Sequence, residues 1–203
     1  MGQIDSLIRS AVAAFNGGFV DEAQALCKEG LRLAPEDAAL HHLLANILFA
    51  KNDPQGAASH LGPSLRRHAN PPARKLAAKI ARKLWEQGEA EAAASLLMQA
   101  IDEASPASLW FDLGLARQDL QDREGAAAAY RAALERQPEM AEAAVNLGVV
   151  LQEAGDMAGA MAAYGRAYRL RPATFGMIAH ALTSAPKGRL WLDPEELKRV
   201  LSA

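Results

Sequence analysis

Residues 110–138 read WFDLGLARQDLQDREGAAAAYRAALERQP, and residues 144–172 read AVNLGVVLQEAGDMAGAMAAYGRAYRLRP. The two stretches carry the same small, aromatic and proline residues at a constant offset of 34. The matching pairs are Leu113 and Leu147, Gly114 and Gly148, Ala126 and Ala160, Tyr130 and Tyr164, Ala133 and Ala167, and Pro138 and Pro172. A fixed period of this length indicates a repeat architecture, in which each unit buries its apolar face only against its neighbours.

The first stretch also has a recognisable internal pattern. Trp110, Leu113 and Gly114 give W-x2-L-G, Ala126 and Tyr130 give a small residue followed by an aromatic, and Pro138 closes the unit. This pattern resembles the tetratricopeptide repeat (TPR) family. Arg117 departs from it, because the family usually has a large aromatic or aliphatic residue there. The resemblance implies an all-α fold, a right-handed superhelical solenoid of antiparallel helix pairs.

The same template, extended in both directions, predicts the organisation of the whole chain. We expect about five repeats in residues 1–173, each of one helix pair, and a closing helix pair in residues 174–203 that caps the stack. The predicted repeats are residues 4–37, 38–73, 74–106, 107–140 and 141–173.

Small residues and helix breakers explain how each repeat would fold. Alanine or glycine recurs where the two helices of a pair touch, which lets the helix axes approach. Gly18, Gly88 and Gly155 are predicted to form the turns between helices. Gly62-Pro63 falls inside the second helix of the second repeat, so we expect that helix to run from Pro54 to about Leu61 and then break.

Composition narrows the classes of function. Half of the residues are hydrophobic. The formal net charge of −2 argues against a globally basic nucleic-acid binder. A single cysteine, Cys27, forms neither an internal disulfide nor a zinc cluster, and no apolar run approaches the length of a membrane span. These features predict a soluble, cytoplasmic protein without a membrane association.

The chain lacks the sequence motifs of common catalytic and nucleotide-binding sites. Cys27 occupies a position where other repeats carry Leu or Tyr, so we expect a packed core thiol. The five histidines, His41, His42, His60, His68 and His180, lack the spacing of a metal site. The sequence therefore predicts a non-enzyme without a metal site or cofactor.

In the TPR family, the first helices of successive repeats line a concave face, and the resemblance implies the same use here. At the fifth, ninth and twelfth helix positions this chain has Ile8, Val12 and Phe15; His42, Asn46 and Phe49; Ala78, Arg82 and Trp85; Phe111, Leu115 and Gln118; and Val145, Val149 and Gln152. The predicted partner-binding residues are His42, Asn46, Phe49, Lys75, Lys79, Arg82, Trp85, Phe111, Leu115, Asn146 and Val149.

Two features of that surface suggest what binds. It is apolar for a water-facing surface, and Phe15, Phe49 and Trp85 either receive a partner's side chains or pack first helices together. Seven Lys or Arg residues and no acid lie between Arg66 and Trp85, followed by acids at Asp112, Asp119, Glu142 and Glu153. This charge distribution favours a bound segment with an acidic patch, although a solvated charged face explains it equally well.

The predicted function is a protein–protein interaction scaffold that holds a helix or an extended segment of a partner protein in its concave groove. Two alternatives remain open: self-assembly into a homo-oligomeric scaffold, and an accessory or regulatory role for a separate transferase-type enzyme. Binding of nucleic acid through the basic stretch is disfavoured.

Overall fold

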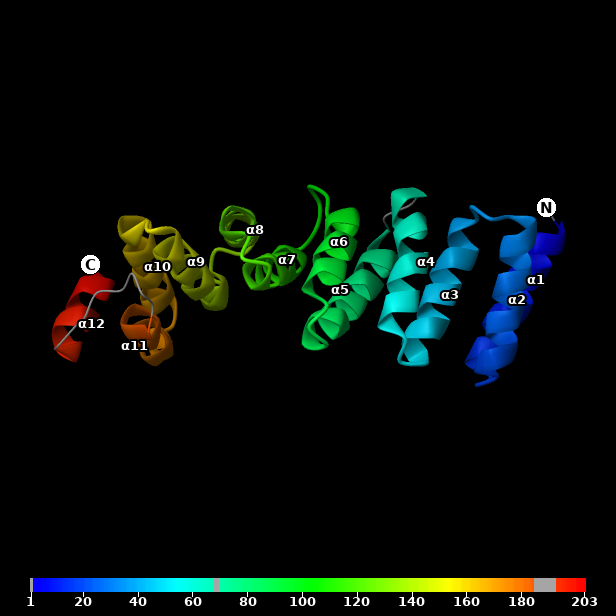
Figure 1. Ribbon diagram of the computed structural model, residues 1–203, viewed down its shortest axis with the longest axis horizontal. Helices are drawn as coiled ribbons and strands as arrows, with labels where there is room; N and C mark the ends of the chain where they lie inside the picture. Colours follow the sequence, from blue (N-terminus) through cyan, green and yellow to red (C-terminus); the bar gives the residue numbers. More distant parts are fainter. Residues whose placement is uncertain (1, 68–69, 185–192) are drawn as a thin grey trace. The chain divides into compact units, whose positions relative to one another are not determined.

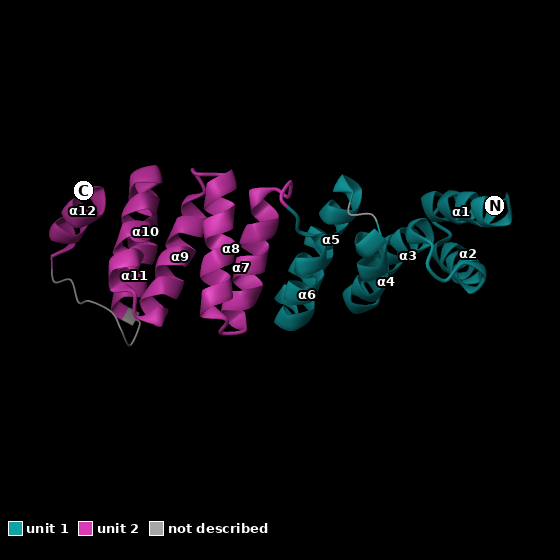
Figure 2. Ribbon diagram, turned by 90° about the horizontal axis from the view of Figure 1, so that it is seen from above, with its two compact units in different colours: residues 1–102 teal, residues 103–203 magenta. Residues whose placement is uncertain are grey.

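The computed structural model describes residues 2–67, 70–184 and 193–203, and over these residues the chain forms only helices. It divides into two compact units, Met1–Asp102 and Glu103–Ala203, which are coloured separately in Figure 2. Figure 1 labels the helices in chain order. The all-α, helical-repeat fold that the sequence predicted is confirmed; the predicted repeat boundaries remain a proposal.

Unit 1 consists of three antiparallel helix pairs. They are α1 (Gly2–Asn16) with α2 (Val20–Leu33), α3 (Ala38–Ala50) with α4 (Pro54–Arg67), and α5 (Pro71–Glu86) with α6 (Ala90–Ala100). Each pair packs on the next through contacts of α2 with α3 and of α4 with α5. Close approach depends on small residues: a Cβ atom on Gly30 of α2 would lie 2.7 Å from Leu40 Cδ1 of α3.

Unit 2 repeats the arrangement with two pairs and a different end. The pairs are α7 (Ala107–Asp119) with α8 (Arg123–Arg136), and α9 (Ala141–Ala154) with α10 (Met157–Leu170). They are followed by a 3-10 helix, η1 (Pro172–Thr174), and by α11 (Phe175–Ser184) and α12 (Pro194–Ser202). One apolar core connects these elements, and its largest fully buried side chains include Tyr130 and Tyr164.

The turns inside the helix pairs share one backbone conformation. Gly18, Gly88 and Gly155 have φ angles of 83°, 82° and 91°, as the sequence predicted for turn residues. Asn52 and Gln121 stand at the corresponding turns with φ angles of 61° and 60°. The left-handed conformation therefore recurs in all five helix pairs, although only three of its positions are glycine.

The expected break in the second repeat is wrong, because α4 continues through Pro63 to Arg67. Proline cannot donate to the carbonyl group four residues earlier, so one helical hydrogen bond is lost. Leu61 and Leu65, on either side of Pro63, are 0% and 3% exposed. Burial of both leucines requires α4 to keep its course, and this packing outweighs the missing hydrogen bond.

A closing helix pair was expected in residues 174–203, and the structure has α11 and α12 in this range. Asp193 caps α12 by accepting a hydrogen bond from the Glu195 amide, and Pro194 occupies the first helical position. Leu197 and Leu201 are buried in the core of unit 2, with α12 packed on α10. Val200, which lies between these two leucines in the sequence, is 44% exposed.

Candidate functional site

The first helices of unit 1 form a continuous surface with a pocket in it. Helix α3 contacts α1 on one side and α5 on the other. A pocket of about 450 Å³ lies where α1 meets α3, and we call it the α1–α3 pocket. Its lining residues are Ile8, Val12, Ala38, Ala39, His42, Leu43, Ser64 and Asn70. Its volume lies within the range of about 300–1,000 Å³ that is usual for ligand pockets.

The wall of the α1–α3 pocket is mainly aliphatic and has no charged side chain. Its polar groups are the imidazole of His42, the hydroxyl of Ser64 and the amide of Asn70. Burial lowers the pKa of His42, which keeps the ring neutral near pH 7. Asn70 is also the N-cap of α5, because its Oδ1 atom accepts a hydrogen bond from the Ala73 amide at 2.9 Å. The pocket therefore suits an apolar side chain.

Helix α5 adds positive charge next to this pocket. Its exposed side includes Lys75, Lys79 and Arg82, spaced i, i+4 and i+7, which we call the α5 cation row. The buried side of the same helix consists of Ala73, Leu76, Ala77, Ile80, Ala81 and Leu84. Arg74 belongs to neither side, because its guanidinium group pairs with the Asp102 carboxylate.

The other predicted residues of unit 1 are partly accessible. Asn46, Phe49 and Trp85 are half-buried. The Asn46 side chain donates a hydrogen bond from Nδ2 to the His42 carbonyl oxygen at 3.1 Å. The structure thus brings His42 and Asn46 together on α3, while the half-buried state of Phe49 and Trp85 suits both groove and packing roles.

In unit 2, three of the four predicted partner-binding residues lie near the Tyr130 side chain or pack against the apolar core that contains it. The ring of Phe111 is 5.8 Å from that of Tyr130, and Asn146 Nδ2 lies 3.5 Å from the Tyr130 hydroxyl. Val149 packs against the same apolar core, and Leu115 is half-buried. Burial raises the pKa of Tyr130, so its hydroxyl stays protonated and donates to Gln118 Oε1 at 2.8 Å.

Several residues expected on the concave face of unit 2 are placed differently. Val145 and Gln152 are buried, at 2% and 1% exposed, so they do not line a free surface. Gln152 Nε2 donates to the carbonyl oxygen of Ala181 in α11, which covers it. The expected acidic lining is also weaker than its sequence suggests. Asp112 is buried, Glu142 pairs with Arg171, and Glu153 lies 3.6 Å from Arg123.

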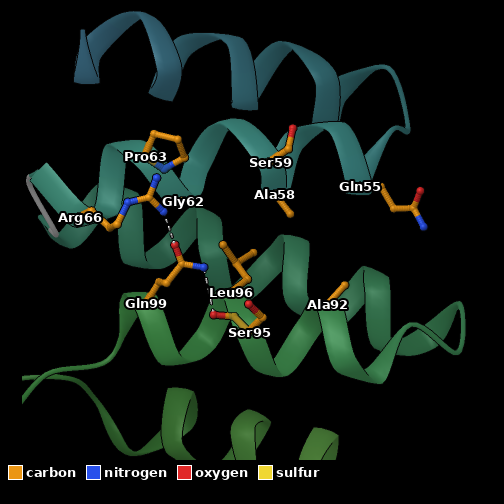
Figure 3. Close-up of a pocket in the computed structure, with 10 residues that line it drawn as sticks. All are labelled: Gln55, Ala58, Ser59, Gly62, Pro63, Arg66, Ala92, Ser95, Leu96 and Gln99. Carbon is orange, nitrogen blue, oxygen red and sulfur yellow. Dashed lines mark hydrogen bonds between the residues drawn. The ribbon is translucent and has the colours of Figure 1, made fainter. Parts of the chain in front are cut away.

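A second pocket, of about 370 Å³, lies between the second helices α4 and α6, and nothing in the sequence pointed to it. Figure 3 shows its lining residues, Gln55, Ala58, Ser59, Gly62, Pro63, Arg66, Ala92, Ser95, Leu96 and Gln99. Arg66 donates to Gln99 Oε1 at 3.0 Å, and Gln99 Nε2 donates to the Ser95 carbonyl oxygen at 3.2 Å. The first bond connects α4 with α6 across the pocket, and the second holds the Gln99 side chain on its own helix, so both have a structural role.

Cysteine, histidine and acidic side chains are those that most often act in catalysis or bind metals. Cys27 is fully buried, and burial raises the pKa of its thiol to about 11, as suits the packed core thiol that the sequence predicted. Among the described residues, no three His, Cys, Asp or Glu side chains cluster as a metal site would require. His68 lies outside the described residues. Across the described ranges, no helix combines the length and hydropathy of a membrane span.

Two histidines form a contact between α3 and α4. His41 Nδ1 and His60 Nδ1 are 3.1 Å apart, and His41 Nε2 lies 2.9 Å from the Pro35 carbonyl oxygen. A carbonyl group only accepts, so His41 carries a proton on Nε2 and its Nδ1 accepts from His60 when both rings are neutral. Burial lowers the pKa of His60, with further lowering from His41 and Lys28 and a smaller opposing effect of Asp53.

We expect unit 1 to lose stability as the pH falls below about 6.5. The pKa of His60 and that of His42 are lower in the folded chain, so the unfolded chain takes up protons first. Stability is thus complete above the unfolded value and declines as the pH falls towards the folded values. Denaturant midpoints at pH 7.5 and 5.5 measure the decline. It should be smaller in His60→Gln and unchanged in the control His180→Gln, which alters an exposed histidine; an unaltered decline in His60→Gln would contradict this account.

Comparison with known proteins identifies the class of this fold. Two models of the tetratricopeptide repeat family match, one over residues 18–80 and the other over residues 111–173, which together make up more than half of the chain. The chain belongs to the tetratricopeptide repeat family, as its resemblance implied. Membership supports a protein-interaction scaffold. No curated protein matches the chain.

Solved structures share the fold at low sequence identity. A crystal structure of MamA matches with a TM-score of 0.61 at 18% identity, over 86% of this chain and 95% of MamA. YrrB, described as a TPR protein with an unusual peptide-binding site, matches with a TM-score of 0.61 at 19% identity, over 88% of this chain and 89% of YrrB. A MamA fragment from Desulfovibrio magneticus RS-1 matches with a TM-score of 0.55 at 20% identity, over 85% of this chain and 98% of the fragment.

Proposed function

We propose that this chain is a non-catalytic scaffold that binds a segment of a partner protein on the surface formed by its first helices. The observation that carries the proposal is the α1–α3 pocket, whose aliphatic wall is open on that surface. Val12 in this wall is 39% exposed, so its side chain is accessible to a partner.

The surface of unit 2 supports the same function in a different way. Phe111, Leu115, Asn146 and Val149 are all partly accessible, and none of them is fully buried in the core. They combine apolar contact area with one amide, a composition suited to a peptide whose backbone needs hydrogen bonds. YrrB offers a precedent within the same fold, since it is described as having a peptide-binding site.

The proposal is tested by selecting peptides from a randomised 12-residue display library on the whole chain. The affinities of the selected peptides are then measured in solution against Val12→Glu in unit 1 and Leu115→Glu in unit 2. Leu33→Glu and Leu170→Glu are matched controls, because these leucines are 53% and 41% exposed and lie on the second helices α2 and α10.

Relative to the unmodified chain, we expect each selected peptide to bind at least about tenfold more weakly to one of the two groove variants, Val12→Glu or Leu115→Glu. Its affinity for both controls should be unchanged. All four variants should keep the helicity of the unmodified chain. The proposed function is rejected if no peptide is enriched, or if the control variants weaken binding as much as the groove variants.

A further inference from the structure

The α1–α3 pocket and the α5 cation row lie on the same side of neighbouring helices. Ala39 and Leu43, which line the pocket from α3, precede Lys75 and Lys79 of α5 by 36 residues each. This is also the interval between the turn residues Asn52 and Gly88 that end the same two helices. The two lysines therefore occupy on α5 the positions that the pocket residues occupy on α3.

The charges on this surface are unbalanced. Helix α3 has no acidic, lysine or arginine side chain, and no acid lines the pocket. Lys75 and Lys79 are exposed, and neither makes an ion pair with any other residue that the structure describes. The only acid on α5 is Glu86, at its last residue. An apolar pocket thus adjoins two exposed lysines, Lys75 and Lys79, that no described carboxylate pairs with.

We propose that the partner of unit 1 is an acidic segment, in which one large apolar side chain fills the α1–α3 pocket and carboxylates face Lys75 and Lys79. The proposal rests on the function proposed above and specifies the chemistry of its ligand. Neighbouring packed helices have axes about 8–10 Å apart. An extended chain covers about 3.3–3.6 Å per residue, so the carboxylates lie about three residues from the apolar side chain.

Attraction between the carboxylates and the α5 cation row would determine which segment binds and how it is oriented. Both lysines are exposed to solvent, so each pair is screened by salt and contributes modestly. The apolar side chain supplies the remaining affinity by leaving water for the pocket. Binding should accordingly weaken with added salt but not vanish.

Three fluorescein-labelled 12-residue peptides test this inference by anisotropy with the whole chain. Each has one central leucine, and the positions three residues before and after it carry glutamates, glutamines or lysines. We expect the glutamate peptide to bind about tenfold more tightly than the glutamine peptide, and the lysine peptide to bind most weakly. The preference should shrink when the salt concentration is raised from about 0.05 to 0.5 M.

The decisive comparison uses the double variant Lys75→Glu and Lys79→Glu. It should lose the preference for glutamate and prefer the lysine peptide. The matched control is Lys28→Glu with Arg32→Glu, which changes the same charge at the same i, i+4 spacing on the exposed side of α2. This control should keep the preference for the glutamate peptide.

The inference is overturned if the glutamate and glutamine peptides bind equally, or if the α2 control loses the preference as well. It is also overturned if the glutamate peptide does not bind at all, or if a single-stranded 12-nucleotide DNA competes for the same lysines more strongly than the peptide does. The proposed function survives each of these results if display selection still yields peptides that depend on Val12 or Leu115, which separates the two claims.

Discussion

Replacement of Tyr164 by alanine is expected to lower the free energy of unfolding of unit 2 by about 3–5 kcal/mol. The Tyr164 side chain is fully buried, and its hydroxyl donates to Gln152 Oε1 at 2.8 Å. Gln152 in turn donates to Ala181, so one ring connects α10, α9 and α11. Its removal leaves a cavity and deprives a buried amide oxygen of its donor.

Tyr168 provides the matched control for this prediction. It is the same residue type on the same helix, one turn later, but it is only half-buried and has its ring 6.0 Å from that of Phe175. Tyr168→Ala should therefore cost clearly less than Tyr164→Ala. Denaturant unfolding followed by circular dichroism, with hydrogen exchange of α9 and α10, measures both. Equal losses in the two variants would show that Tyr164 does not connect these helices.

The fold could be predicted from the sequence because each helix pair places the same requirements on residues close together in the chain. A helix pair needs a small residue at the contact, a left-handed residue at the turn and a stop after the second helix, and each leaves a sequence trace. Asn52 and Gln121 show that the turn conformation is kept even where the turn residue is not glycine. Both adopt the left-handed conformation without being glycine, because the helices on either side impose the turn.

The candidate site was harder to predict, because exposure depends on what packs against a helix from outside its own repeat. Gln118 and Gln152 occupy the same helix position 34 residues apart, and each accepts a hydrogen bond from a tyrosine hydroxyl. Gln118 is half-buried, whereas Gln152 is buried because it also contacts α11. A pattern confined to one repeat does not contain that difference.

The α1–α3 pocket illustrates the same limit. Ile8, Val12 and His42 were assigned to the concave face from their helix positions, and all three line the pocket, as does Leu43. Asn70 joins the pocket because it caps α5, and Ser64 because α4 continues past Pro63. The asparagine before two prolines is a readable capping signal, whereas the continuity of α4 depends on tertiary packing.

Gly114→Ala is expected to destabilise unit 2 by about 1–2 kcal/mol, although alanine favours helix over glycine by about 1 kcal/mol. A Cβ atom on Gly114 would lie 2.4 Å from Tyr130 Cε1, and the ring is fully buried between the hydrogen bond to Gln118 and the Phe111 side chain. Because these contacts hold the buried ring in place, we expect overpacking to outweigh the gain in helix propensity.

The sign of this effect distinguishes packing from propensity, and Gly176 in α11 supplies the comparison. A Cβ atom there meets no atom within 4 Å, so Gly176→Ala should be neutral or stabilising by up to about 1 kcal/mol. In a Tyr130→Leu background, Gly114→Ala should lose most of its cost, because the ring that it would strike is gone; the coupling is read from the double-mutant cycle of unfolding free energies. If both glycine variants stabilise the chain, or if the cost persists without the ring, then contact between Gly114 and Tyr130 does not set the spacing of α7 and α8.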